Sequence, residues 1–266
     1  MIRRIALSLA LACASALAQN QAPQELIDFA KSLPAPPFGP RGTTRSGMPQ
    51  VFTPGTEAIY RKMVQSPGER AELEDKARRL FEIYLADAKA GDPIAAVSVS
   101  RFYSPRGVGT ALDLRQGFFW AKKAAEDGVP VAAIYVGSMY EQGQGTAPDL
   151  REAVRWYRKA EETYGPVRAE LLRKSLVQAE ALVRDKDFYG AYTVLVQAVR
   201  AEPWSAAAWY NYALVCGELA HDPQNGVGYA RMAIGSMHMF LALAPDSPQA
   251  RGAQDLIYQW ELKAKK

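Results

Sequence analysis

The sequence GTALDLRQ at residues 109–116 recurs as GTAPDLRE at residues 145–152, thirty-six positions later. In the same way, WAKKA at 120–124 recurs as WYRKA at 156–160. A spacing of thirty-seven separates further glycines and alanines, namely Gly91, Gly128, Gly165, Ala95, Ala132 and Ala169. Such a period is typical of stacked-repeat proteins, in which each unit buries its apolar face only against its neighbours.

Helical periodicity begins at Glu69 and continues to the C-terminus. Apolar residues first recur every three or four positions from Leu73 to Ala88, which indicates one broad stripe on a helix. The sequence Gly91-Asp92-Pro93 predicts the end of that helix and the start of the next. No stretch has a convincing alternation of period two. We therefore predict an all-α fold, an α/α superhelical solenoid of stacked antiparallel helix pairs.

The later copy shows how one unit is built. Its first helix carries an apolar face, and Gly143-x-Gly145 then provides a tight turn with positive φ. Asp149 is placed to cap the second helix. The packing positions of the two helices are Ala132, Val136, Gly137 and Tyr140 in the first, and Ala153, Trp156, Tyr157 and Ala160 in the second.

These residues resemble the Sel1-like repeat family over residues 91–165. The earlier copy follows the same pattern but has Ser100 for the usual glycine and Gly117 for the usual alanine. It also carries one extra residue between Tyr103 and Gly107. The resemblance implies helix pairs that form a binding scaffold. Some cysteine-rich relatives are associated with penicillin binding, but this chain lacks their cysteines, so that association is not transferred.

The C-terminal part resembles tetratricopeptide repeats over residues 172–245. Two sets of residues share one spacing there, Ala191, Leu195, Ala198 and Pro203 in the first and Ala233, Met237, Phe240 and Pro245 in the second. Residues 246–262 are predicted to form a closing helix. About eight extra residues predict a protruding loop at 217–228. A tolerated insertion and a binding loop both remain open for it.

The N-terminus is typical of a secretory signal. Arg3 and Arg4 precede a short apolar stretch, and cleavage is predicted after Ala18. The alternative is a lipoprotein anchored through Cys13, because the residues before this cysteine resemble a lipobox. The predicted divisions are a signal (1–18), a Pro/Gly-rich extended or disordered arm (19–56) with one short helix at Gln24–Ser32, N-terminal capping helices (57–90), two Sel1-like repeats (91–165), and tetratricopeptide-like repeats with a C-terminal capping helix (166–266).

Composition argues against several classes of partner. The chain has 32 basic and 28 acidic residues, and its net charge falls to about +2 once Arg3 and Arg4 are removed. This near-neutral balance gives no electrostatic case for nucleic acid. No stretch after the signal is long and apolar enough to predict a transmembrane segment. Without Cys13, Cys216 has no partner for an intramolecular disulfide, and its apolar neighbours predict a buried thiol.

Motifs for catalysis, metal binding or cofactor binding are not found. The two histidines, His221 and His238, are too few for a multi-histidine metal site. The glycine pairs 107/109 and 143/145 are not dinucleotide-binding fingerprints, because no strand precedes them. We therefore predict no catalytic residue, no metal and no cofactor. Charge runs such as Arg70 to Arg79 are interpreted as solvated helix faces.

The leading functional hypothesis is a periplasmic or secreted interaction module. Stacked helix pairs create a concave groove, lined by residues that the core does not need. Such a groove would hold an extended peptide or a partner helix, and its predicted lining is Arg173, Glu180, Arg184, Tyr210 and Asn211. The alternative is a cell-wall-ligand-binding protein or enzyme, with a site in the Pro-rich arm or in the loop around His221.

Overall fold

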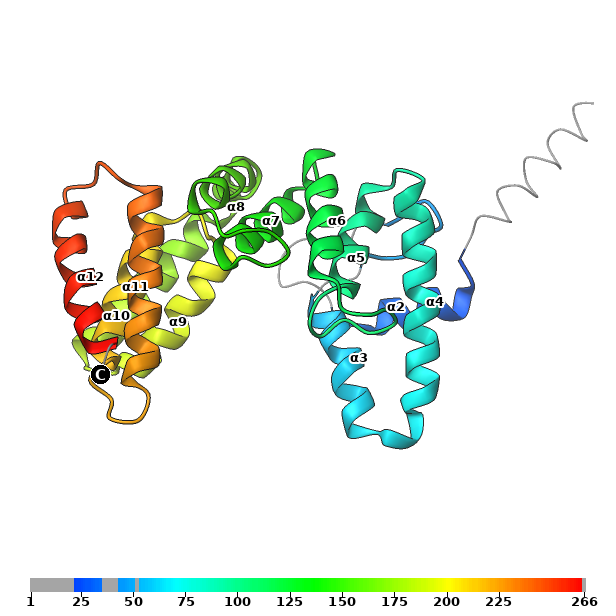
Figure 1. Cartoon of the computed structure of the whole chain (residues 1–266), viewed down its shortest axis with the longest axis horizontal. Helices are drawn as coiled ribbons and strands as arrows, with labels where there is room; N and C mark the ends of the chain where they lie inside the picture. Colours follow the sequence, from blue (N-terminus) through cyan, green and yellow to red (C-terminus); the bar gives the residue numbers. More distant parts are fainter. Residues whose placement is uncertain (1–21, 35–42, 51–52, 265–266) are drawn as a thin grey trace, which may run out of the picture. The chain divides into compact units, whose positions relative to one another are not determined.

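The computed structural model describes residues 22–34, 43–50 and 53–264, and these residues are almost entirely helical (Figure 1). The predicted signal and Cys13 lie outside the described residues. Within them, strand pairing is limited to one bridge between Thr43 and Pro49. The all-α class is therefore confirmed. The helices are α2 (Gln24–Ser32), α3 (Thr53–Gln65), the 3-10 turn η1 (Pro67–Glu69), α4 (Arg70–Lys89), α5 (Pro93–Phe102), α6 (Leu114–Glu126), α7 (Pro130–Gln142), α8 (Leu150–Arg184), α9 (Phe188–Ala201), α10 (Ala206–Leu219), α11 (Gly226–Leu243) and α12 (Ala250–Ala264).

The chain divides into two compact units. The first runs to Met139 and includes Gly143–Ala147, and the second comprises Tyr140–Gln142 and everything from Pro148 onward. In the first unit α5 packs on both α4 and α6, while α2 and α3 pack on α4. In the second unit each helix from α8 to α12 packs on the next along the chain. Consecutive antiparallel helix pairs are thus the building principle of both units.

Aspartates begin the helices of the repeats. Asp149 accepts hydrogen bonds from the backbone N–H groups of Arg151 and Glu152, and Asp113 accepts one from Gln116. Each bond satisfies a donor that has no partner within its own helix. The capping role predicted for Asp149 is confirmed, and Pro93 opens α5 directly after its cap as the sequence predicts.

The repeat turns depend on glycine at two equivalent positions. Gly109 has φ +97° and Gly145 has φ +75°, a region that disfavours residues with a Cβ. A Cβ on Gly109 would lie 2.4 Å from the carbonyl oxygen of Ala77 in α4, and one on Gly145 would lie 1.9 Å from that of Leu114 in α6. Each turn therefore rests directly on the backbone of an earlier helix.

The first glycine of each pair behaves differently in the two copies. Gly143 has φ +68° and ends α7 in the left-handed conformation, as the sequence predicts. Gly107, the equivalent glycine of the earlier copy, is not among the glycines with positive φ. The extra residue between Tyr103 and Gly107 gives the earlier turn a different path over the end of α5.

Gly145→Ala should therefore lower the free energy of unfolding by about 3 kcal/mol or more, measured by urea denaturation of the full chain. The change adds a backbone clash to the cost of an unfavourable φ. Gly128→Ala is the matched control, because Gly128 has φ +87° but nothing within 4 Å of its Cβ position. The control should lose only about 1 kcal/mol. Equal losses in the two variants would contradict the backbone contact.

The segment 43–50 corrects the predicted arm. We expected residues 19–56 to be extended or disordered apart from a helix at Gln24–Ser32, and that helix is present as α2. Residues 43–50, however, pack against the turn between α4 and α5, with Met48 0 % exposed. The backbone N–H of Arg45 donates to Asp92 at 2.6 Å, and the hydroxyl of Ser46 donates to Asp87. The carboxylates of α4 and α5 hold a segment whose own sequence has no helical or strand pattern.

Asp92 holds segment 43–50 and also caps α5. Its other carboxylate oxygen accepts hydrogen bonds from the N–H groups of Ile94 at 2.9 Å and Ala95 at 3.1 Å. Asp92→Ala should lower the free energy of unfolding by about 2–3 kcal/mol, since it removes a helix cap and leaves the Arg45 N–H without its acceptor. Asp113→Ala removes a cap only and should cost about 1 kcal/mol. Urea denaturation of both variants compares them, and a loss for Asp92→Ala no larger than for Asp113→Ala would argue against the link to segment 43–50.

Helix α8 differs from the prediction. The repeat pattern leads us to expect a helix end at Gly165, yet α8 continues through Gly165 and Pro166 to Arg184 over 35 residues. Pro166 lacks the N–H that a helix interior normally uses, which explains why the sequence indicates a boundary here. Ala169 is exposed, whereas its counterparts Ala95 and Ala132 are fully buried. The repeat pattern of the first two copies has therefore ended before this point.

The predicted loop at 217–228 is mostly helical. Helix α10 extends to Leu219 and α11 begins at Gly226, which leaves only residues 220–225 between them. The carboxylate of Asp222 closes this turn by accepting from the N–H groups of Gln224 and Asn225. The extra residues lengthen the helices instead of forming a protruding loop. At the C-terminus, α12 occupies the place of the predicted closing helix and buries Trp260.

Candidate binding groove

The second unit contains a pocket of about 800 Å³ between the C-terminal half of α8, the start of α9, and α10. We call it the α8–α10 groove. Its apolar lining consists of Leu176, Val177, Ala179, Val183, Phe188, Leu195, Leu214 and Val215. Its polar lining consists of Arg173, Glu180, Arg184, Lys186, Asn211 and Glu218. Volumes of this size are typical of sites that bind a ligand or a segment of a partner.

In the groove, the C-terminal half of α8 is only partly covered by its neighbours. Ala179 and Leu195 are buried where α8 and α9 pack together. Val177, in contrast, remains 55 % exposed within the groove. A valine in this position leaves apolar surface in contact with water, which costs free energy that a bound partner would recover.

Four of the five residues predicted for the groove line it, namely Arg173, Glu180, Arg184 and Asn211. Tyr210 does not line it, because its ring packs on Phe240 of α11 with the ring centroids 4.9 Å apart. Successive residues of a helix point about 100° apart, so Tyr210 and Asn211 face different neighbours. The sequence analysis did not identify Lys186 and Glu218 as lining residues.

Most of the apolar lining was also not identified from the sequence, because a single helical stripe does not reveal which part of it stays uncovered. A signal was nevertheless present in α8, where Leu176 and Val183 are seven positions apart and Val177 lies beside them. This makes the apolar stripe wider than contact with α9 alone requires.

Two arginines of the groove are already paired along α8. Arg173 donates two hydrogen bonds of 2.8 Å to Glu170, and Arg184 donates one of 3.3 Å to Glu180. The partners are exposed, so water and salt screen each pair and it adds little to stability. Their effect is to hold the long side chains along the groove edge. The ionic groups of Lys186 and Glu218 form no ion pair with any residue in the described ranges.

Lys186 has an unusual backbone. It is the one described residue other than glycine with a positive φ, 60°. The N–H of Lys186 donates to the carbonyl of Val183, and that of Asp187 donates to the carbonyl of Leu182. This pattern is the Schellman ending of a helix, whose left-handed position is usually glycine. A lysine therefore occupies a glycine position at the edge of the groove.

Comparison with known proteins identifies the repeats. The Sel1 repeat family matches residues 102–129 and 130–162. The chain carries two Sel1 repeats. The Sel1 matches end before Arg173, so the α8–α10 groove lies outside them, and the tetratricopeptide resemblance of residues 172–245 stays a prediction. No curated protein matches the chain.

Two solved structures are similar to this Sel1-repeat chain. One is a Sel1 repeat protein from Oxalobacter formigenes, 23 % identical, with 79 % of this chain and 83 % of that chain covered and a TM-score of 0.33. The other is c5321, a protective antigen of uropathogenic Escherichia coli strains displaying an SLR fold. It is 18 % identical, with 80 % of this chain and 53 % of that chain covered and a TM-score of 0.31.

A charged cluster joins α8, beyond its Sel1 match, to the turn before α10. The guanidinium of Arg168 lies 4.2 Å from the ring centroid of Tyr164 and donates to the carbonyl of Ala201 at 2.6 Å. The neighbouring Glu202 is only 2 % exposed. Burial raises the pKa of its carboxyl to about 6, although the positive charge of Arg168 opposes this.

Glu202 makes stability depend on pH. Its pKa of about 6 in the folded chain exceeds the ordinary value of 4.5, so the folded state binds the proton more tightly than the unfolded state. This carboxyl therefore destabilises the fold at pH 7, and the effect disappears as pH falls through 6 towards 4.5. Glu202→Gln should raise the free energy of unfolding at pH 7 by on the order of 1–2 kcal/mol and leave it nearly unchanged at pH 4.5. Urea denaturation at both pH values measures the difference, and a gain independent of pH would show that the carboxyl is not the cause.

Groups suited to metal binding are not gathered in the described residues. No three His, Cys, Asp or Glu side chains there are placed to hold a metal ion. The ring nitrogen Nε2 of His221 lies 2.9 Å from the ammonium of Lys263. Cys216 is buried as predicted, and burial raises the pKa of its thiol to about 12. No helix in the described ranges has the length and apolar character needed to cross a membrane.

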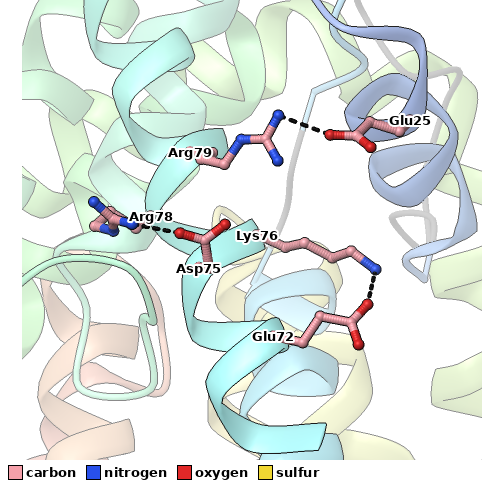
Figure 2. Close-up of polar contacts among 6 residues, drawn as sticks. All are labelled: Glu25, Glu72, Asp75, Lys76, Arg78 and Arg79. Carbon is pink, nitrogen blue, oxygen red and sulfur yellow. Dashed lines mark hydrogen bonds and ion pairs between the residues drawn. The ribbon is translucent and has the colours of Figure 1, made fainter.

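A second pocket, of about 710 Å³, lies in the first unit among α3, α4 and the turn at 107–110. Its charged lining is paired within α4, Arg70 with Glu74 at 2.8 Å and Arg78 with Asp75. Figure 2 shows the Arg78–Asp75 contact beside the Lys76–Glu72 pair and the contact of Arg79 with Glu25 of α2. The charge run from Arg70 to Arg79 was predicted to be a solvated helix face. Its side chains form ion pairs along that face.

Proposed function

We propose that this Sel1-repeat chain is a non-catalytic interaction module that binds a partner protein or peptide in the α8–α10 groove. The observation that carries the proposal is the pocket of about 800 Å³. Its apolar lining on α8 and α10 is left uncovered. Protein interfaces commonly centre on such an apolar region, surrounded by charged and polar side chains. Arg173, Arg184 and Glu218 provide that surround here.

The place of action that we propose is the bacterial cell envelope. The predicted signal with cleavage after Ala18 supports a periplasmic or secreted chain, and anchoring through Cys13 is the alternative. In either case the groove would meet partners outside the cytoplasm. Mass spectrometry of the mature N-terminus separates the two, because a lipid on Cys13 changes both the mass and the first residue.

Val177→Glu should reduce partner recovery from native envelope extracts at least tenfold, because it places a charge in the centre of the apolar lining. The melting temperature should change little, since Val177 is 55 % exposed. Val167→Glu is the matched control, a valine of the same helix that is 83 % exposed and does not line the groove. Recovery is measured by quantitative pull-down. Equal recovery with wild type and Val177→Glu, or a loss confined to Val167→Glu, would place the binding surface elsewhere.

A further inference from the structure

The α8–α10 groove is mainly apolar and offers few uncommitted hydrogen-bonding groups along its length. Its lining contains eight apolar side chains, five charged ones and a single amide, that of Asn211. Arg173 and Arg184 are already bonded to Glu170 and Glu180 of their own helix. The other two charged groups, Lys186 and Glu218, lie at one end of the groove. Along the middle of α8, α9 and α10 the backbone groups are used within the helices themselves. The turn that joins α8 to α9 is closed by its own bonds, those from Lys186 to Val183 and from Asp187 to Leu182.

This shortage discriminates between the two kinds of occupant. An extended peptide would bury several N–H and C=O groups without partners, and each would cost roughly 1–3 kcal/mol. An α-helix satisfies these groups internally and presents only side chains. A mainly apolar groove, in which half of the polar side chains are already paired along α8, therefore suits a helix better than an extended strand.

We propose that the occupant is an amphipathic α-helix of a partner protein, a proposal that rests on the function proposed above. The lining runs from Arg173 on α8 to Lys186 just beyond the end of that helix, which corresponds to about 20 Å at 1.5 Å per residue. A partner helix of about fourteen residues matches this length. Its apolar residues recur at positions i, i+3 or i+4, and i+7, so that they face Val177 and Leu214.

The charges give the partner helix a direction. Because successive helices are antiparallel, α8 and α10 run the same way, and both end near Lys186 and Glu218. A partner helix antiparallel to them places its N-terminus at this end, where its positive dipole end meets the negative ends of α8 and α10. The carboxylate of Glu218 accepts from the free N–H groups of the partner's first turn. Lys186 pairs with an acidic residue of that turn.

Site-specific photo-crosslinking of the full chain in its native envelope tests the proposal. A benzophenone side chain is placed at Arg173, Val177 or Lys186 of the groove, or at Val167 as the control. Mass spectrometry then identifies the crosslinked residues of the partner. We expect the groove positions to reach one partner segment, at residues spaced by three, four and seven. Lys186 should reach its N-terminal part and Arg173 its C-terminal part.

Each other result has a distinct meaning. Crosslinked residues at a spacing of two would overturn the helix and leave the proposed function intact. Reversed positions for Lys186 and Arg173 would overturn the direction. Crosslinks to the chain's own sequence or to an acyl chain would overturn a partner helix in favour of a second copy or a lipid. Crosslinks from Val167 alone would overturn the proposed function itself.

A synthetic peptide of the crosslinked segment provides a second readout. Proline at a central position that faces away from the groove should weaken binding about a hundredfold in fluorescence anisotropy, because proline breaks a helix. Alanine at the same position is the control and should bind as the native peptide does. Equal affinity of the proline and alanine peptides would overturn the helical occupant, since an extended peptide tolerates proline.

Discussion

Close approach of helices through small side chains is the constraint on which both units depend. Alanines are fully buried where the helices meet, including Ala77, Ala88, Ala95, Ala124, Ala191, Ala213, Ala230 and Ala233. A methyl group contributes little apolar area, so each contact depends on short distance and good fit. For this reason the turns largely determine how closely the helices approach one another. Gly145 rests on the α6 backbone, and an added Cβ would push the two apart.

The sequence predicts well whatever is decided within one repeat. The cap at Asp149, the left-handed end at Gly143 and the helix at Gln24–Ser32 follow from local chemistry, and the structure has all three. Other features depend on distant contacts and could not be predicted. Segment 43–50 is held by Asp87 and Asp92, which its own sequence does not reveal. Helix α8 passes Pro166 because helical residues on both sides continue the same helix.

The groove shows the same division. Its charged residues were predicted by setting aside the positions that the repeat pattern assigns to the core, and this identified Arg173 and Arg184. The same logic does not identify Val177, because apolar character does not distinguish a covered side chain from an uncovered one. Tyr210 was misplaced because one step along α10 turns a side chain from the groove towards α11. In the second unit, which neighbour a helical side chain faces is decided only when all the surrounding helices are packed.

The burial of Cys216 has a consequence for the redox chemistry of the chain. Exchange of thiols with disulfides requires the thiolate, and a thiol with a pKa of about 12 inside α10 hardly forms one. The folded chain is therefore inert towards mixed disulfides, although it carries a free cysteine. An unfolded chain loses this protection at once and exposes an ordinary thiol.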